Sequence, residues 1–438
     1  MHVSVFPMCL EPRPGGRTAP CFGQNRVNSF ILDRIPARRQ PAGFARTKEM
    51  VNFTESRKDS SIFRQILNAI NNHCPFLSTA EIVRLRSRWY CTGSVVVVPE
   101  GCSTGKERST DMAQAVGHGA CWAGFDLGGT KMMAAIYDGR FRELARERKK
   151  TKPSEGFKPG IERMVRTIQD GLAAAGVKPG RLRGIGLGCP GPVDMKRGIV
   201  LEAPNLGWTR ARVRDAMEKV FKCRVVVAND VDAGLFGEYM FGAARGARCA
   251  VGIFPGTGIG GACIYEGRIL RGSVYSCMEI GHIPVQPEGP VCGCGRRGCL
   301  EALASRLAVA AAAALASHRG KAPCLQRCAG ADVAAMRSGT LAESLRAGDK
   351  AVTEIVLQSA RWLGRGIATV VNLLAPDAVI LGGGLVEAMP RSYIEEAERT
   401  ARSLCMSTYR NCFKVKRASL GDDAVVLGAA ALAEQAES

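Results

Sequence analysis

The sequence predicts an α/β fold with two related lobes, a cleft between them and an N-terminal extension of uncertain order. From Cys121 onwards, strand-like and helix-like runs alternate, as in α/β proteins. The run AAIYDG at 134–139 recurs as ACIYEG at 262–267, and each copy follows a glycine-rich turn. The chain has 438 residues and is 46% hydrophobic, which suits a large core in two or three domains.

Residues 1–117 differ from the rest of the chain. They hold sixteen Lys and Arg against nine Asp and Glu, a net +7 of the total +20. Segment 60–86 resembles two amphipathic helices joined at Pro75. A helix-turn-helix needs a recognition helix next, but 88–101 has the pattern of a strand. We therefore expect 1–117 to be poorly ordered or not part of the working protein, with Met112 as an alternative start.

The first lobe is expected at 118–235, completed by a C-terminal helix at about 423–437. Its first strand ends in DLGGTK (126–131) and a second strand follows the glycine turn. The charged run FRELARERKK comes next and is left unassigned. The remaining elements are predicted, in order, as a helix at 160–176, a strand and loop at 183–194, a helix at 213–221 and a strand at 224–230.

The second lobe is expected at 236–422. GTGIGG (256–261) leads into the strand that carries the repeated motif. The alanine-rich run at 307–317 is predicted as a buried helix, because no apolar run reaches the roughly 18 residues of a membrane span. Near the end, LGGG (381–384) follows a short apolar strand.

The glycine turns point to phosphate binding. Both GTGIGG and GLGCPG (186–191) fit the dinucleotide pattern, but that fingerprint must open a helix and GTGIGG enters a strand. A Rossmann site is therefore disfavoured, and the P-loop pattern is absent from the sequence. Glycines still let backbone N–H groups approach phosphate oxygens closely, and LGGG suits the approach of a base or ribose.

The run CGCGRRGCLE (292–301) places three of the eighteen cysteines within eight residues. The N-terminus lacks a secretory signal pattern, so we expect reduced cysteines in the cytoplasm, where a cluster suggests a metal. Zinc takes four ligands, and the nearest further donor is His282. A cluster of free thiols is the alternative.

From 118 to the C-terminus the chain resembles the ROK family, whose members are sugar kinases and related repressors of the actin-like (ribonuclease H-like) sugar-kinase fold. The motifs occur in family order: DLGGTK, CPGPVD (189–194), APNLGW (203–208), AND (228–230), GTGIGG, EIGH (279–282), CGCGRRGCLE and LGGG. The sequence SCM (276–278) departs from the small residues usual before EIGH.

The resemblance implies a sugar site. Asp230, at the end of an apolar strand, becomes the catalytic base for the primary hydroxyl, although an Asn-Asp pair is often only a turn. The other implied sugar-binding residues are Asn205, Asn229, Glu279, His282 and Glu301. The resemblance also implies a structural zinc held by His282, Cys292, Cys294 and Cys299, which would organise the sugar site rather than the ATP turns.

ATP with Mg²⁺ is the implied phosphoryl donor, and Asp126 would hold waters of the Mg²⁺. The residues expected at the phosphates are Gly128, Gly129, Thr130 and Lys131 from one lobe and Gly256, Thr257 and Gly258 from the other. Gly383 and Gly384 are expected at the adenosine.

The function expected from the resemblance is ATP-dependent phosphorylation of the 6-hydroxyl of a hexose, with glucose as the first choice. Mannose, N-acetylglucosamine, N-acetylmannosamine and allose stay open. The alternatives are a sugar-responsive repressor and a zinc-stabilised sugar-binding protein without catalysis. The intact DLGGTK turn and the missing recognition helix favour the kinase. We expect a homodimer or higher homo-oligomer, no membrane partner and, despite the charge of +20, no nucleic-acid partner.

Overall fold

The computed structural model describes residues 27–30, 51–54, 119–273 and 275–437. The chain forms two compact units, Met1–Arg108 and Ser109–Ser438. In the first unit, β1 (Val27–Phe30) pairs antiparallel with β2 (Val51–Thr54). The helices predicted at 60–86 and the strand predicted at 88–101 lie outside the described residues.

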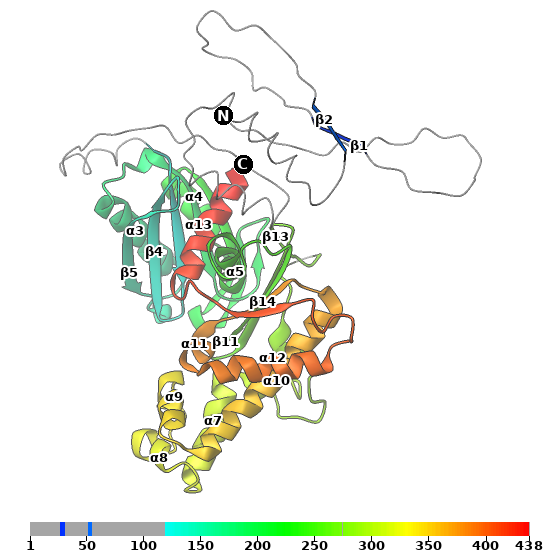
Figure 1. Ribbon diagram of the computed structural model, residues 1–438. Coiled ribbons are helices and arrows are strands. Elements are labelled where there is room, and N and C mark those ends of the chain that lie inside the picture. The colour runs from blue at the N-terminus through cyan, green and yellow to red at the C-terminus, as the bar shows by residue number, and fades with distance from the viewer. Residues whose placement is uncertain (1–26, 31–50, 55–118, 274, 438) are drawn as a thin grey trace, which may run out of the picture. The chain divides into compact units, whose positions relative to one another are not determined.

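The second unit contains two five-stranded sheets, each with its own helices (Figure 1). The first sheet, which defines the N-terminal lobe, has the order β10-β6-β3-β4-β5. Strands β10, β6 and β3 are parallel, whereas β4 and β5 are antiparallel to their neighbours. The strands are β3 (Cys121–Leu127), β4 (Lys131–Asp138), β5 (Glu143–Lys150), β6 (Leu182–Cys189) and β10 (Arg224–Asn229). The charged run that the sequence left unassigned is thus β5, an edge strand whose side chains are exposed or half-buried.

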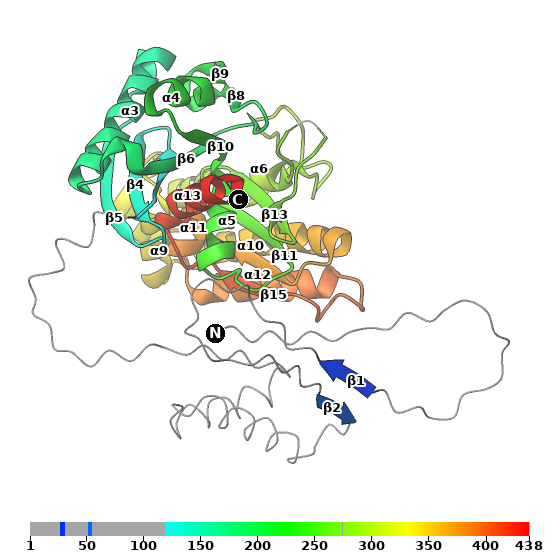
Figure 2. The same ribbon diagram turned by 90° about the horizontal axis from the view of Figure 1, so that it is seen from above.

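Helices cover this sheet because they present apolar or small faces to it. In α3 (Phe157–Ala174) the buried residues Met164, Ile168 and Leu172 recur every four positions, which is one face of a helix. The C-terminal helix α13 (Asp423–Glu437) packs on β3, β6 and α5 (Asp230–Phe241), and it runs beside α5 in both views (Figure 2). Glycine is required beneath α13: a Cβ on Gly186 would lie 1.7 Å from the Ala429 carbonyl oxygen.

A smaller sheet extends the N-terminal lobe beyond β6. Its order is β7-β8-β9, and all its pairs are antiparallel. Its strands and the nearby helical elements are β7 (Val193–Asp194), β8 (Ile199–Ala203), β9 (Trp208–Arg212), α4 (Val213–Phe221) and the 3-10 turns η2 (Pro153–Glu155), η3 (Pro179–Arg181) and η4 (Pro204–Leu206). The helix predicted at 213–221 is found at those residues.

The second large sheet, which defines the C-terminal lobe, repeats the layout of the first. Its order is β13-β12-β11-β14-β15, with two antiparallel pairs on one side and two parallel pairs on the other. The strands are β11 (Cys249–Pro255), β12 (Ile259–Tyr265), β13 (Arg268–Ile269), β14 (Ala378–Leu381) and β15 (Lys414–Arg417). The repeated motif therefore falls on β4 and β12, which occupy equivalent places, and the prediction of two related halves is confirmed.

The helices of the C-terminal lobe enclose the hydrophobic core of that lobe. They are α6 (Leu300–Ala304), α7 (Arg306–His318), α8 (Pro323–Ala329), α9 (Ser338–Arg346), α10 (Lys350–Leu374), α11 (Gly383–Ala388) and α12 (Arg391–Leu404), with the 3-10 turn η5 at Ile280–His282. The helix predicted at 307–317 is α7, but only one face is buried, since Leu307 and Leu315 are about half exposed. Among the described residues, no helix is long and apolar enough to cross a membrane.

Candidate active site

Two carboxylates lie at the carboxyl ends of β3 and β10, the parallel strands on either side of β6. Asp126 of β3 lies opposite Gly188 of β6, and Ala228 of β10 lies opposite the same glycine from the other side. Asp230 follows at the start of α5, so both side chains are at one edge of the sheet, where α/β proteins bind ligands. Burial raises the pKa of Asp230 to about 6. Burial and then the charge of Asp230 raise the pKa of Asp126 to about 7.

Asn229 holds the junction between β10 and α5. Its Oδ1 accepts hydrogen bonds from the N–H groups of Val231 (2.9 Å) and Asp232 (3.3 Å), which makes it the N-cap of α5. Its Nδ2 donates to the Gly191 carbonyl oxygen at 3.1 Å. The structure thus gives Asn229 a capping contact, and its predicted bond to a sugar hydroxyl stays a prediction.

The first glycine turn, 128–131, joins β3 to β4. Thr151 fastens it from one side: its hydroxyl donates to the Gly128 carbonyl oxygen at 2.7 Å, and its N–H donates to the Thr130 carbonyl oxygen at 2.9 Å. Thr130 and Lys131 are exposed. Asn205 packs against this turn, because a Cβ on Gly129 would lie 3.4 Å from the Asn205 Cβ. One predicted sugar residue is therefore beside the predicted phosphate turn.

The second glycine turn, between β11 and β12, is hydrogen-bonded to a residue of α6 in the C-terminal lobe. The Ile259 N–H donates to Glu301 Oε2 at 2.9 Å. A Cβ at 258 would lie 2.2 Å from the same oxygen, so any larger residue there would have to displace the Glu301 side chain. The Gly383 turn adjoins this region, because a Cβ on Gly383 would lie 2.9 Å from the Pro255 carbonyl oxygen. Three predicted segments, 256–258, 301 and 383–384, are thus neighbours.

Contacts between the lobes bring the remaining residues close. Val231 packs directly against Gly260, where a Cβ would lie 2.7 Å from Val231 Cγ2. This places Asp230, one residue earlier, next to the second glycine turn. Behind that turn, a Cβ on Gly281 would lie 2.3 Å from the Ile259 carbonyl oxygen, so the segment with Glu279 and His282 also packs there.

The SCM departure has a structural consequence at Met278. This residue has φ of 69°, in the left-handed region that favours glycine. Its carbonyl oxygen accepts the Ile280 N–H at 2.6 Å, and the residue between them is Glu279, which is exposed. The predicted sugar-binding residue Glu279 therefore follows directly on a left-handed backbone position and lies within a tight turn.

The four predicted metal ligands converge. One ligand atom from each of His282, Cys292, Cys294 and Cys299 lies within 4.8 Å of all the others. The Sγ atoms of Cys294 and Cys299 are 3.7 Å apart, and Cys292 Sγ is 3.7 Å from His282 Nδ1. A tetrahedral zinc site with ordinary bond lengths places its ligand atoms about 3.5–3.8 Å apart. The donor set therefore suits zinc, and these two distances match those of such a site.

Glu301 links this cluster to the second glycine turn. Its Oε1 lies 3.7 Å from Cys292 Sγ, while its Oε2 accepts the Ile259 N–H. The sequence suggested that the metal loop would serve the sugar residues and leave the ATP turns apart. In the structure one side chain touches both.

Asp232 is a carboxylate that sequence reasoning missed. It is only 2% exposed, and its Oδ2 has no hydrogen-bond partner among the described residues. Burial, with Asp230 as the next cause, raises its pKa to about 7. Its position two residues after Asp230 was the available signal, but burial of the side chain depends on contacts that the local sequence does not show.

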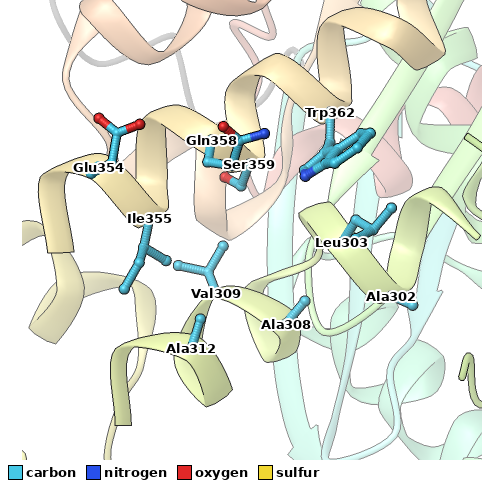
Figure 3. Close-up of a pocket in the computed structure, with 10 residues that line it drawn as sticks. All are labelled: Ala302, Leu303, Ala308, Val309, Ala312, Glu354, Ile355, Gln358, Ser359 and Trp362. Atoms are coloured by element: carbon cyan, nitrogen blue, oxygen red, sulfur yellow. The ribbon is translucent and has the colours of Figure 1, made fainter. Parts of the chain in front are cut away.

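A separate hollow of about 400 Å³ lies between α6–α7 and α10 (Figure 3). Its lining is mostly apolar and includes Leu303, Val309, Ile355 and Trp362, with Glu354 at one side. It contains none of the predicted site residues. The candidate active site is therefore defined by the two glycine turns and the carboxylates, and this hollow lies apart from it.

Comparison with known proteins decides the family. The model of the ROK family matches residues 122–436, most of the chain. This chain belongs to the ROK family. The ROK family glucokinase from Streptomyces griseus, solved in complex with glucose and AMPPNP, is 32% identical, with a TM-score of 0.63 over 72% of this chain and 100% of that protein. The predicted resemblance and the actin-like fold of two lobes are confirmed.

ROK relatives of two kinds are found. The glucokinase of Streptomyces coelicolor is 31% identical over 317 residues, 71% of this chain and 97% of that protein. The xylose repressor of Caldicellulosiruptor bescii is 28% identical over 271 residues, 60% of this chain and 66% of the repressor. The ROK match alone therefore does not separate a kinase from a repressor.

Proposed function

We propose that this ROK protein is an ATP-dependent sugar kinase that phosphorylates the 6-hydroxyl of a hexose, with glucose as the first candidate. The observation that carries the proposal is the placement of Asp230. Its carboxylate shares a sheet edge with Asp126 and adjoins the second glycine turn through Val231. The glucokinase relatives, matched over nearly their whole length, support the same assignment.

In the proposed reaction, Asp230 accepts the proton of the sugar hydroxyl while that oxygen attacks the terminal phosphorus of ATP. The bond from phosphorus to the bridging oxygen breaks, and ADP leaves with the bond's electron pair. The Val231 N–H donates to Asp230 Oδ1 at 2.9 Å and holds the carboxylate in place. A pKa near 6 keeps Asp230 mostly ionised at neutral pH yet basic enough to accept a proton.

The glycine turns would receive the phosphates from both lobes. Backbone N–H groups of 128–131 and 256–258 suit phosphate oxygens, and Gly383 and Gly384 would lie at the adenosine. Asp126 would hold waters of Mg²⁺, which when bound neutralises charge on the phosphates. This role suits a carboxylate whose pKa is raised by burial, because a cation would favour its ionised form.

We further propose that His282, Cys292, Cys294 and Cys299 hold a structural zinc. Because His282 Nδ1 faces Cys292, the metal would take Nδ1 and leave Nε2 for a sugar hydroxyl. Glu279, Glu301 and Asn205 would supply further sugar contacts. The interpretation of 292–299 as free thiols predicts no bound metal, and metal analysis of the purified protein separates the two.

A sugar-responsive repressor is the second candidate, favoured by the match to the xylose repressor. That match leaves a third of the repressor uncovered, and the DLGGTK turn is complete in this chain. An ADP-release assay with six hexoses and N-acetylhexosamines tests the kinase directly. We expect turnover with at least one sugar and loss of it in Asp230→Asn. A chain that turns over none of the sugars but binds a defined DNA site at physiological salt would be a repressor.

A further inference from the structure

Arg306 makes two contacts with the second glycine turn. It is the first residue of α7, and its N–H donates to the Gly256 carbonyl oxygen at 2.9 Å. Its Nη2 donates to Thr257 Oγ1, also at 2.9 Å. The N-cap Ser305, whose hydroxyl accepts the Ala308 N–H at 3.2 Å, fixes where the helix begins. Backbone and side chain therefore hold the guanidinium at this turn.

The guanidinium has no carboxylate partner in the part of the chain that the structure describes. Arg306 takes part in none of the ion pairs found among the described residues. Its side chain makes one hydrogen bond in this part of the chain, to Thr257, although a guanidinium has five N–H donors. Several donors on a fixed, half-buried cation are thus available to an anion.

The turn itself offers matching donors. Thr257 Oγ1 accepts from Arg306, which leaves its own hydrogen free to donate. We find no hydrogen bond from the N–H groups of Thr257 and Gly258 to any described residue. The Gly256 N–H, by contrast, donates to the Gly258 carbonyl oxygen at 2.8 Å. A hydroxyl, two N–H groups and a guanidinium are thus donors available to an anion at this turn.

Because a carboxylate already lies at this turn, binding an anion there requires a cation. Glu301 Oε2 accepts the Ile259 N–H and would touch a Cβ at Gly258. A phosphate placed at this turn would meet that carboxylate's negative charge. Arg306, which contacts Gly256 and Thr257 of the same turn, would offset it.

We propose that Arg306 binds the phosphate chain of the nucleotide, together with Thr257 and Gly258. This inference rests on the proposed kinase function and adds to it a residue outside the motifs GTGIGG and CGCGRRGCLE. A guanidinium suits the task, because its planar donors match phosphate oxygens in pairs.

The test compares Arg306→Gln with Arg306→Lys. Glutamine removes the charge and is too short to replace Nη2 at Thr257, while the backbone bond from residue 306 to the Gly256 carbonyl oxygen is kept. We expect Arg306→Gln to raise the KM for ATP about tenfold and to leave the sugar KM within about twofold. Arg306→Lys should show about a threefold rise, since it keeps the charge and loses the planar fork. Arg319→Gln, at the other end of α7, is the matched control and should leave both KM values unchanged.

Calorimetry with ATP and with adenosine separates this inference from the proposed function. Arg306→Gln should weaken ATP binding and leave adenosine binding unchanged, because adenosine carries no phosphate. If the unmodified chain turns over no sugar, the proposed function fails, and the ATP-to-adenosine comparison still decides the role of Arg306. An ATP affinity in Arg306→Gln equal to that of the unmodified chain, equal losses for ATP and adenosine, or no ATP binding by the unmodified chain would overturn the inference.

Discussion

The two lobes share one sheet order but contribute to the candidate site in different ways. The N-terminal lobe contributes charge: Asp126, Asp230 and Asp232 are carboxylates whose pKa values burial raises to about 6 or 7. Its glycine turn accepts two hydrogen bonds from Thr151. The C-terminal lobe contributes a turn that is hydrogen-bonded to Glu301 and Arg306. Glu301 also contacts the cluster of proposed metal ligands.

Because of this difference, we expect substitutions in the two lobes to have different effects. Buried carboxylates lower stability at neutral pH, and proteins accept such a cost at functional sites. The second glycine turn is joined through Glu301 to the proposed metal loop, so it would need the metal for its position. Changes to the N-terminal carboxylates should therefore affect rate, pH dependence and stability, whereas changes around the metal should affect the binding of both substrates.

The largest effect is expected at Asp230. Asp230→Asn removes the proposed base while keeping the size of the side chain, so kcat should fall about 10²–10⁴-fold with sugar binding largely intact. Asp215→Asn, an exposed residue paired with Arg212, is the control and should keep its activity. A turnover of Asp230→Asn within threefold of the unmodified chain would remove Asp230 from the mechanism.

Acid should inactivate the enzyme through the same carboxylate. The proposed base Asp230 would act in its ionised form, and its pKa is raised to about 6, so activity should be present above that pH and lost as the pH falls through it. We expect kcat/KM at pH 5 to be about tenfold below its plateau, with an apparent pKa that Asp126 also influences. A profile that stays flat from pH 7 to pH 5, with the fold intact, would contradict the assignment.

Much of this arrangement could be predicted from the sequence, because short motifs carry it. The repeated AAIYDG and ACIYEG located β4 and β12, and the spacing from EIGH to CGCGRRGC identified four residues that the structure brings together. Contacts between distant segments were beyond that reasoning. The bond of Glu301 to Ile259 and that of Arg306 to Thr257 depend on how α6 and α7 pack against β12. The strand β5 was missed because its charged residues give no apolar alternation.

Asp232 tests how much a buried, ionised carboxylate lowers the stability of the N-terminal lobe. Its pKa is raised from 3.8 to about 7, so the folded state disfavours the ionised form and stability is lost as the pH rises across that interval. Asp232→Asn cannot ionise and should be more stable at pH 7.5, by on the order of 2 kcal/mol, with the gain vanishing near pH 4. Thermal unfolding at both pH values measures this. A variant that is less stable at pH 7.5 would show that the charged form of Asp232 is favoured by the fold.

The smallest effect is expected from removing the first unit. All the site residues lie in the unit Ser109–Ser438. A chain that starts at Met112 should keep its kcat, both KM values and its melting temperature. Loss of activity on truncation would show that the two lobes are not sufficient, and sequence-specific DNA binding that only the full chain shows would favour the repressor.

The central claim, that the metal loop positions the second glycine turn as well as the sugar residues, is tested most directly by Cys294→Ala. Cys294 is the exposed member of the cluster, so the substitution removes one ligand with little change to the core. We predict a loss of the one zinc per chain and a rise of about tenfold in the KM for sugar and also for ATP, because Glu301 connects both sites to the cluster. Cys328→Ala, an exposed cysteine outside the cluster, should change neither. Active enzyme without zinc, or a zinc-free variant in which the KM for ATP stays unchanged, would contradict the claim.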